Sequence, residues 1–391
     1  MSEWKEYKLG EIAEIIPGFA FKSKEFGKIG ELVIKIKDIN PPYIILSAME
    51  RVDTSSYPKD KLGKYKLAKG DFVVAMTGAT IGKVGKLKTD VLAYINQRVA
   101  KIKAKNCVCN DFIYYSISTE QFQAFIRNNI DSNTAQENIS AISIGKFPIL
   151  LPPLPEQKAI AAILSSLDDK IDLLHRQNST LEKMAETLFR QWFIEEAKER
   201  EKTKIGLVLE TVLGGTPSTK KPEYWDGTIP WINSGEVNNF RILKPTKFIT
   251  ELGLAESNTK LLPIGTTVLA ITGATLGQIS LLEISTCANQ SVVGIIPNET
   301  YPKEYVFLWI KYMIDEIILN ETGGAQPHIN KNDVNETEIL VPCNDDLEFI
   351  ESKIKPLFKK ISINSFQINT LIELRDSLLP KLMSGEIIVE F

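Results

Sequence analysis

The sequence is poor in the residues that build disulfide frameworks, metal centres and membrane spans. Its 391 residues include four cysteines and two histidines, and these are scattered along the chain. Few, scattered cysteines are typical of proteins in a reducing cytoplasm, and no group of cysteines and histidines has zinc-site spacing. No apolar stretch approaches the ~20 residues of a membrane helix, and the N-terminus does not resemble an export signal. We therefore expect a cytoplasmic protein with no metal site and no membrane contact.

A strong net charge is also missing. The formal charge of −3 argues against a uniformly basic nucleic-acid binder. The average hides an asymmetry, because residues 1–150 hold 22 Lys+Arg against 16 Asp+Glu, whereas residues 205–342 hold 9 against 15. A modest basic excess in the first block is compatible with phosphate contact, and the second block must rely on local placement of its charges. The length allows two or three domains.

One long amphipathic stretch occurs twice. Residues 155–193 carry apolar side chains in steps of three and four with no internal Gly or Pro, which predicts a single long helix. The pattern returns 190 positions later. A stripe this narrow is best buried against the other copy, so we expect an antiparallel coiled coil. At matched seam positions Leu174 is replaced by Asn364 and Ile368 by Asn178, and a polar residue on a seam can fix its register.

The remaining blocks also repeat. In residues 1–150 the pattern predicts strands over 32–38, 71–76, 83–87, 98–103 and 146–151, and one helix over 111–129. The segment Thr77-Gly-Ala-Thr-Ile-Gly82 returns 195 positions later, and Asn96-Gln97 returns as Asn289-Gln290. A second helix is expected over Lys303–Asn320. We infer an α+β fold: two mixed α/β domains, each followed by a long helix, with an internal pseudo-two-fold.

Two motifs suggest catalysis, but neither has the context it needs. Asn40-Pro-Pro-Tyr43 is typical of amino-methyltransferases that hold a flipped adenine, yet no Gly-rich cofactor turn accompanies it. Gly78-Ala-Thr-Ile-Gly82-Lys83 resembles a phosphate loop, but it is one residue short and lacks the Ser/Thr that holds magnesium. Simple turns explain both segments better. A stand-alone adenine DNA methyltransferase and a coiled-coil scaffold without a DNA role remain alternatives to a non-catalytic binding protein.

The pattern that remains is one of binding. Asn, Gln, Arg, Lys and Thr side chains read base edges and phosphates. The candidates in the first block are Lys22, Lys24, Lys35, Lys37, Lys83 and Arg98; those in the second are Thr216, Ser218, Lys220, Lys221, Trp231, Asn233, Arg241 and Gln278.

Three segments resemble a known family. Residues 151–193, which begin LPPLPEQKAIAAIL, are similar to the central conserved region of the specificity subunits of type I restriction–modification systems. Ser377 to Val389 (SLLPKLMSGEIIV) resembles their C-terminal conserved ending, and Gly214 to Val237 resembles the opening of a target-recognition domain. The departures are mild: Asn344-Asp-Asp346 replaces the Pro-Glu-Gln that begins the first helix, and Gly18 to Lys22 replaces the Gly-Thr-Pro-Ser turn.

The resemblance implies a sequence-specific DNA-binding subunit rather than an enzyme. Each recognition domain would read one half of a bipartite site in double-stranded DNA, while the helices set the spacer and dock two methyltransferase subunits. Translocase–endonuclease subunits would join through the complex. S-adenosylmethionine, ATP and magnesium would belong to these partners, so the chain itself would hold no cofactor. The implied boundaries are 1–153 and 204–343 for the recognition domains, 154–203 for the central helix and linker, and 344–391 for the C-terminal helix.

Partner contacts are expected where the helices keep apolar side chains that the seam does not use. Apolar surface left exposed on a helix is typical of an interaction site. The candidates are Phe189, Trp192 and Phe193.

Overall fold

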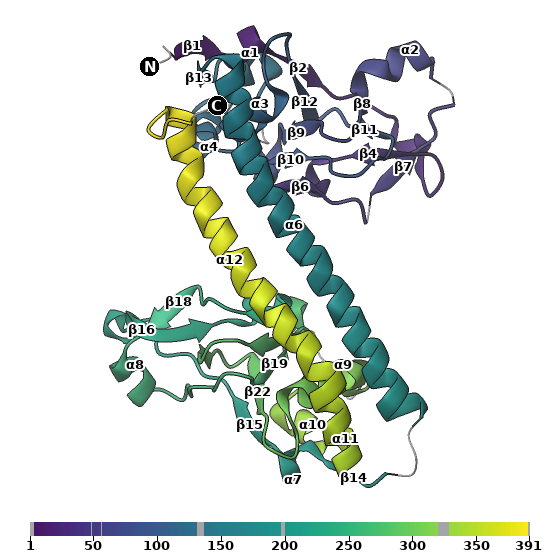
Figure 1. The fold of residues 1–391 in the computed structure, drawn as a ribbon, viewed down its shortest axis with the longest axis vertical. Helices are drawn as coiled ribbons and strands as arrows, with labels where there is room; N and C mark the ends of the chain where they lie inside the picture. Colours follow the sequence, from purple (N-terminus) through teal and green to yellow (C-terminus); the bar gives the residue numbers. More distant parts are fainter. Residues whose placement is uncertain are drawn as a thin grey trace. The chain divides into compact units, whose positions relative to one another are not determined.

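The fold is that of a computed structural model, which describes residues 4–47, 49–55, 57–130, 137–196, 200–319 and 328–389 (Figure 1). The chain forms two compact units. Unit 1 comprises Met1–Lys170 and Leu371–Phe391, and unit 2 comprises Ile171–Thr370. Each unit combines β-sheets with a segment of each of the two long helices.

Unit 1 contains three sheets. The short pair is β1 (Lys5–Lys8) with β13 (Pro148–Leu151). The six-stranded sheet has the order β2 (Ala13–Pro17), β12 (Val99–Ala104), β9 (Phe72–Ala75), β10 (Val84–Lys86), β6 (Tyr43–Ile44) and β5 (Ile39–Asn40). The five-stranded sheet has the order β3 (Phe26–Gly27), β7 (Glu50–Val52), β4 (Glu31–Ile34), β11 (Ala93–Ile95) and β8 (Lys66–Leu67).

The core of unit 1 lies on both faces of its six-stranded sheet. All four residues of β9 are buried, as expected for a central strand without polar alternation. On one face Phe72 packs with the helix α3 (Asn110–Ile117), and on the other Val73 packs with residues of β4 and β11. Four strand predictions in this unit are confirmed within a few residues; the fifth, over 32–38, ends early because the chain turns into the short helix η2 (Ile36–Asp38).

The predicted single helix over 111–129 is wrong, because the structure has two helices there. Helix α3 ends at Ile117, and α4 (Glu120–Asn128) begins after Thr119. The Thr119 hydroxyl accepts a hydrogen bond from the Phe122 N–H at 3.3 Å and donates to the Ser116 carbonyl at 2.9 Å. Thr and Ser side chains that bond to the backbone in this way favour a cap over a continuing helix.

Unit 2 repeats this plan. Its short pair is β14 (Lys202–Lys204) with β23 (Glu338–Leu340). Its five-stranded sheet has the order β15 (Glu210–Leu213), β22 (Val292–Ile296), β19 (Thr267–Ala270), β20 (Ile279–Leu282) and β17 (Arg241–Ile242). Its three-stranded sheet has the order β18 (Lys247–Ile249), β16 (Trp225–Ile232) and β21 (Cys287–Ala288). The five strands of the larger sheet match the order β2, β12, β9, β10 and β6 in unit 1.

The remaining helices and 3-10 turns are short, apart from α9 in unit 2, which has 17 residues. Unit 1 has α1 (Leu9–Ile12), α2 (Lys59–Leu62), α5 (Ala141–Ile144) and the 3-10 turns η1 (Ser23–Glu25), η3 (Gly63–Tyr65) and η4 (Gly78–Thr80). Unit 2 has α7 (Ile205–Val208), α8 (Glu251–Ala255), α9 (Lys303–Leu319), α10 (Lys331–Glu336), η6 (Pro222–Tyr224), η7 (Ser234–Asn238) and η8 (Gly273–Thr275). The predicted helix over 303–320 is confirmed as α9 as far as Leu319, and Asn320 lies outside the described residues.

Both predicted long helices form. Helix α6 spans Leu154–Arg190 and continues as the π-helical turn η5 (Gln191–Glu195). The second is helical throughout α11 (Asn344–Phe349), η9 (Ile350–Ile354) and α12 (Lys355–Ser384). It ends before Gly385, whose φ of 76° suits a glycine at a helix C-terminus. None of the helices described combines the length and apolarity of a membrane span.

The two helices pack antiparallel within each unit, as predicted (Figure 1). In unit 2 the ring of Trp192 stacks on Phe349 at 4.3 Å, and nearer the middle of both helices the amide of Asn364 donates to Asn178 Oδ1 at 2.9 Å. Asn364 is completely buried. The polar seam position predicted from the repeat is therefore a hydrogen-bonded pair of asparagines flanked by Leu174 and Ile368, both of which are buried.

Candidate nucleic-acid interface

In unit 1, two parallel strands end at one edge of the five-stranded sheet. Strands β4 and β11 pair in register. Lys35 follows β4, and the turn 96–99 follows β11; the Asn96 N–H donates to the Ile34 carbonyl at 3.0 Å and so ties the two strand ends together. Polar side chains that follow neighbouring parallel strands gather at the same edge and can meet one ligand. We call this group the first edge; it consists of Lys35, Gln97 and Arg98.

Unit 2 has the same arrangement where β16 and β21 end. These strands are also parallel, and the Asn289 N–H donates to the Ile232 carbonyl at 3.0 Å. Asn233 follows β16, and the turn 289–292 follows β21. The hydroxyl of Thr216 donates a hydrogen bond to Gln290 Oε1. We call this group the second edge; it consists of Thr216, Asn233 and Gln290.

The two edges differ in charge. Beside the first edge, Glu50 on β7 accepts hydrogen bonds from the ammonium groups of Lys35 and Lys37, the latter at 2.9 Å. These two bonds hold the pKa of Glu50 below its ordinary value. The Lys35 ammonium also lies 3.9 Å from the centre of the Phe26 ring. Asn233, at the position of Lys35 in the second edge, is neutral and its side chain accepts a hydrogen bond from the Gly235 N–H at 2.7 Å.

The predicted residues of the segment 216–231, which runs from a loop into β16, fall into two groups: exposed side chains and side chains held by the protein itself. Thr216, Ser218 and Lys220 are exposed. Lys221 is held by the Tyr224 hydroxyl and Glu256, and its hydrogen bond to Tyr224 raises the pKa of the ammonium group. Trp231 is buried, and its indole N–H donates to the Gly215 carbonyl at 3.1 Å. Trp231 therefore supports the loop from beneath and does not present its ring to a ligand.

The other predicted DNA-contact residues do not belong to either defined edge. Lys22 and Lys24 are exposed on and beside η1. Lys83 is exposed after the turn η4, while at the matched position Gln278 has a buried side-chain oxygen with no hydrogen-bond partner among the described residues. As predicted, the segment that resembles a phosphate loop is a turn between two strands, β9 and β10. Arg241 is 5% exposed and belongs to the junction described below.

Gln97 and Gln290 are not among the residues predicted to contact DNA. Both side chains are exposed. The repeat of Asn96-Gln97 as Asn289-Gln290 is visible in the sequence, but it does not by itself indicate a function. The parallel strand pairs place each dipeptide beside other polar residues and so make it a candidate for ligand contact.

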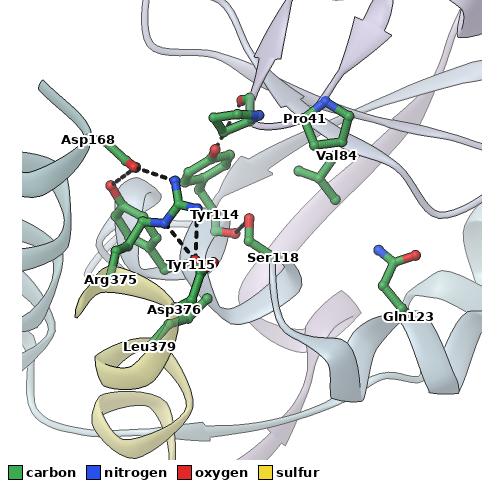
Figure 2. Close-up of a pocket in the computed structure, with 11 residues that line it drawn as sticks. Pro41, Val84, Tyr114, Tyr115, Ser118, Gln123, Asp168, Arg375, Asp376 and Leu379 are labelled. Atoms are coloured by element: carbon green, nitrogen blue, oxygen red, sulfur yellow. Dashed lines mark hydrogen bonds and ion pairs between the residues drawn. The ribbon is translucent and has the colours of Figure 1, made fainter. Parts of the chain in front are cut away.

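In unit 1 the six-stranded sheet meets the long helices through a buried polar cluster (Figure 2). Asp168 of α6 is 5% exposed. It accepts hydrogen bonds from the Tyr115 hydroxyl at 2.8 Å and from Arg375 of α12 at 3.0 Å. Arg375 also contacts Asp376 at 2.7 Å. Burial lowers the pKa of Arg375, but its bonds to Asp376 and Asp168 outweigh this and raise it overall, so the guanidinium stays charged.

The tetrapeptide Asn40-Pro-Pro-Tyr43 lies against this cluster. It forms the turn between β5 and β6, with a cis peptide bond between the two prolines. The Tyr114 hydroxyl donates to the Pro42 carbonyl at 3.0 Å, and the Tyr43 hydroxyl reaches the Asp168 carbonyl at 3.4 Å. The prolines line a cavity of about 200 Å³ whose other walls include Asp168 and Arg375. The expectation of a turn is confirmed, and the turn serves to attach the sheet to the helices.

The corresponding junction of unit 2 has the charge on the sheet. Arg241 on β17 holds the place of Tyr43, because each pairs in parallel with the strand that follows the Gly-Ala-Thr turn. Its guanidinium carbon lies 4.7 Å from the ring centres of Phe240 and Phe358 and 5.8 Å from that of Phe307. Its partner Glu283 lies at 3.4 Å and is 7% exposed in its side chain. Burial lowers the pKa of Arg241 to about 10, although Glu283 acts against this.

The partner contacts were predicted on the premise that these apolar side chains are exposed, and this premise is wrong for Phe189 and Phe193. Phe189 and Phe193 are only 2% and 1% exposed, because they pack on Tyr305 of α9. Trp192 is partly buried and donates its indole N–H to Asp346 at 2.8 Å. The helical stripe is confirmed, but helix α9 of the recognition domain that follows covers the side that was expected to stay open.

The helices expose other apolar residues, and these fall at matched positions of the repeat. Leu173 and Ile363, which are 190 positions apart, are 40% and 51% exposed. Met184 and Leu374, also 190 positions apart, are 47% and 43% exposed. Exposed apolar residues at duplicated positions give each helix the same surface feature.

Comparisons with known proteins agree with this architecture. The family model of the type I restriction modification DNA specificity domain matches residues 1–183 and again residues 197–374. The MjaIX specificity subunit of Methanocaldococcus jannaschii is 26% identical over 99% of this chain and 94% of its own length. The HindI specificity subunit of Haemophilus influenzae is 23% identical over 99% of this chain and all of its own length.

A solved structure shows the same fold. The crystal structure of the S subunit of a type I restriction–modification system from M. genitalium superposes with a TM-score of 0.61 at 16% identity, covering 98% of this chain and 96% of that one. Two copies of the family domain account for nearly the whole sequence, and the larger sheets of the two units share the order of five strands. The chain therefore belongs to the family of type I restriction–modification DNA specificity subunits.

Proposed function

We propose that each unit of this chain recognises one half of a split DNA sequence. The observation that carries this proposal is the duplication of one edge: two parallel strands end in a polar, exposed group in unit 1 and again in unit 2. The side chains at these edges include the amide, hydroxyl and cationic groups that bind base edges and phosphates. Two recognition modules on one chain multiply specificity, because each wrong base pair costs roughly 1–3 kcal/mol.

The long helices would set the unspecified gap between the half-sites. Each recognition domain is attached to a helix by buried contacts rather than by a flexible linker, at Asp168 in unit 1 and at Arg241 in unit 2. A rigid attachment makes the separation of half-sites a geometric property of the protein. The recognition domains in this proposal are residues 1–153 and 204–343.

The helices would also dock two methyltransferase subunits, through which translocase–endonuclease subunits join. The matched exposed residues Leu173 and Ile363, with Met184 and Leu374, support this because a duplicated apolar feature suits two copies of one partner. Methyl transfer and ATP-driven chemistry would then take place on the partners with S-adenosylmethionine, ATP and magnesium.

The decisive experiment is a methylation map. A host without native methylation would express this chain together with the methyltransferase subunit encoded beside it, and the control would omit this chain. Long-read sequencing should reveal a split motif with a fixed gap only when the chain is present. A stable complex without any motif would contradict the proposal and favour a scaffold.

The gap can be tested separately. Insertion of four residues after Gln177 and four after Gln367 lengthens both helices by ~6 Å while keeping their pairing, which corresponds to at most about two base pairs of ~3.4 Å. The recognised gap should lengthen while both half-sites stay the same. A changed half-site with an unchanged gap would contradict the role of the helices.

Docking can be tested on the exposed residues. The double variant Leu173→Asp, Ile363→Asp should lose co-purification with the methyltransferase subunit, while the matched variant Thr180→Asp, Thr370→Asp on the same helices should retain it. Equal retention in both variants would exclude this surface as the docking site.

A further inference from the structure

The Asn-Gln turn is the part of the two edges that the duplication has preserved most closely. Four backbone hydrogen bonds around it recur in both units. The N–H groups of residues 96, 99, 18 and 76 donate to the carbonyls of residues 34, 96, 99 and 98 at 3.0, 2.8, 2.8 and 2.9 Å. The matched bonds, from residues 289, 292, 214 and 271 to residues 232, 289, 292 and 291, measure 3.0, 3.1, 2.9 and 2.9 Å.

A glycine packed against each turn keeps it in place. A Cβ atom on Gly18 would lie 2.1 Å from the Asn96 carbonyl oxygen, and one on Gly214 would lie 2.1 Å from the Asn289 carbonyl oxygen. No side chain fits at that distance, so both positions require glycine. The glutamine that follows each asparagine therefore starts from the same backbone position in the two units and is exposed in both.

The side chains around the glutamines are not preserved. Lys35 of the first edge corresponds to Asn233 of the second, and Arg98 corresponds to Ser291, so both cations are replaced by neutral groups. Residues that distinguish one half-site from the other are expected to differ in this way. A side chain that stays the same on a preserved backbone is instead suited to a feature that the two half-sites share.

We infer that Gln97 and Gln290 each read an adenine at the same place in their half-sites. This inference rests on the proposed function of the two units. A glutamine amide presents a donor and an acceptor side by side, which matches the N7 acceptor and N6 donor of adenine in the major groove. A phosphate group would use the amide donor alone and leave the acceptor idle, and cationic residues are the more usual contacts for it.

Thr216 orients the amide in the second edge. Its hydroxyl donates to Gln290 Oε1, which fixes the amide plane and leaves the second lone pair of that oxygen and both N–H groups for a base. Ala20 stands at the matched position of unit 1 and has no hydroxyl. Thr216 is thus a positioning residue for the second half-site alone.

The test uses the complex of the full chain with its methyltransferase subunit and duplexes that carry the motif found in the methylation map. In one series every recognised base pair is replaced singly, and in another each adenine of the motif is replaced by 7-deazaadenine, which lacks the N7 acceptor. The wild-type complex should lose about 10- to 100-fold in affinity at one adenine of each half-site, the range of a bidentate base contact. Gln97→Ala should lose a similar factor on the unmodified motif and become indifferent to 7-deazaadenine in the first half-site only.

For each variant the half-site that it does not contact is the internal control, and a substitution away from both edges is the external control. Gln290→Ala should change the second half-site only, Thr216→Val should weaken the same preference without affecting the first, and Gln121→Ala on the exposed face of α4 should change neither. The inference is overturned by an equal loss on all DNA sequences, which would indicate a phosphate contact, by unchanged discrimination, or by half-sites without a sensitive adenine. Those outcomes leave a split wild-type motif intact, whereas failure of the proposed function would leave no motif at all.

Discussion

In unit 1 the ion pair that joins sheet and helices lies on the helices, whereas in unit 2 it lies on the sheet. Asp168 and Arg375 belong to the helices of unit 1, and the sheet adds Tyr43. In unit 2 the sheet supplies Arg241 and Glu283, and the helix supplies Phe358, the residue 190 positions after Asp168. Five strands of the larger sheet have the same order and pairing in both units, so the duplication has kept this backbone arrangement while the side chains that fill the junction have diverged.

The two guanidinium groups experience opposite environments. Two carboxylates surround Arg375 and raise its pKa overall, whereas burial lowers the pKa of Arg241 to about 10. Aromatic faces can hold a guanidinium, but they replace less of its hydration than a carboxylate does. Unit 2 therefore depends more strongly on Glu283, the carboxylate that pairs with Arg241, and substitutions at the two junctions should have unequal effects.

The largest effect is expected for Glu283→Ala. It removes the carboxylate at 3.4 Å from Arg241 in its buried aromatic cage, and loss of one partner of a buried ion pair typically costs about 3–5 kcal/mol. Urea unfolding followed by tryptophan fluorescence would measure it, since Trp192, Trp225, Trp231 and Trp309 all lie in unit 2. The double variant Arg241→Met, Glu283→Leu should recover most of the loss. A cost below about 1 kcal/mol for Glu283→Ala would show that the rings alone stabilise the cation.

A smaller loss of stability, about 1–3 kcal/mol, is expected for Asp168→Ala in unit 1. Tyr115 loses its buried acceptor, but Arg375 keeps Asp376 and has a side chain that is 19% exposed. The neighbouring variant Asp169→Ala is the matched control, because its ion pair with Lys88 is at the surface and should contribute at most about 1 kcal/mol. A loss for Asp168→Ala as large as that for Glu283→Ala would remove the distinction between the junctions.

Single substitutions on the helical seam should have a comparable or slightly smaller effect. Asn178→Ile removes the acceptor at 2.9 Å from the buried Asn364 and leaves it the longer contact to Gln177 Oε1 at 3.4 Å. A poorly satisfied buried amide costs about 1–3 kcal/mol. The double variant Asn178→Ile, Asn364→Leu should be neutral or stabilising, since it makes the seam apolar like the flanking positions of Leu174 and Ile368. Thermal unfolding of the single and double variants decides this; additive losses would mean that the asparagines do not act as a pair.

Much of the fold could be predicted because its signals are periodic and duplicated. The stripe of residues 155–193 specifies a helix by its spacing, and the copy 190 positions later supplies the partner that buries it. The break between α3 and α4 was not visible, because Ser118-Thr119 is equally compatible with a helix interior until the Thr119 hydroxyl is seen to cap the second helix. Helix propensity alone is compatible with one continuous helix, and the hydrogen bonds of Thr119 determine that there are two.

The site was less predictable than the fold. Exposure cannot be read from residue type. The sequence therefore predicted surface roles for four residues that the structure buries: Phe189, Phe193, Trp231 and Arg241. The edges depend on which strands pair in parallel, a long-range property that no local pattern encodes. The Asn-Gln repeat was the available signal for Gln97 and Gln290, and it needed the strand pairing to acquire a meaning.

The smallest effect is expected at the first edge, where Glu50 joins Lys35 and Lys37. These lysines hold the pKa of Glu50 below its ordinary value of 4.5, so the ionised form is favoured in the folded chain. The contribution to stability is therefore present above about pH 4.5 and disappears as the pH falls through the lowered pKa. Because the groups are partly exposed, Glu50→Gln should lower stability at pH 7 by at most about 1 kcal/mol, and the difference from wild type should shrink at acid pH. In unit 2 the neutral Asn233 replaces Lys35, and its N–H donates to Glu236. The control Glu236→Gln therefore removes no ion pair at this edge, and its effect on stability should be the same at low and high salt. Melting curves of the two variants at pH 7 and pH 4 test this contrast; a difference for Glu50→Gln that grows at pH 4 would mean that Glu50 acts there as a neutral hydrogen-bonding group rather than as the counter-charge of the two lysines.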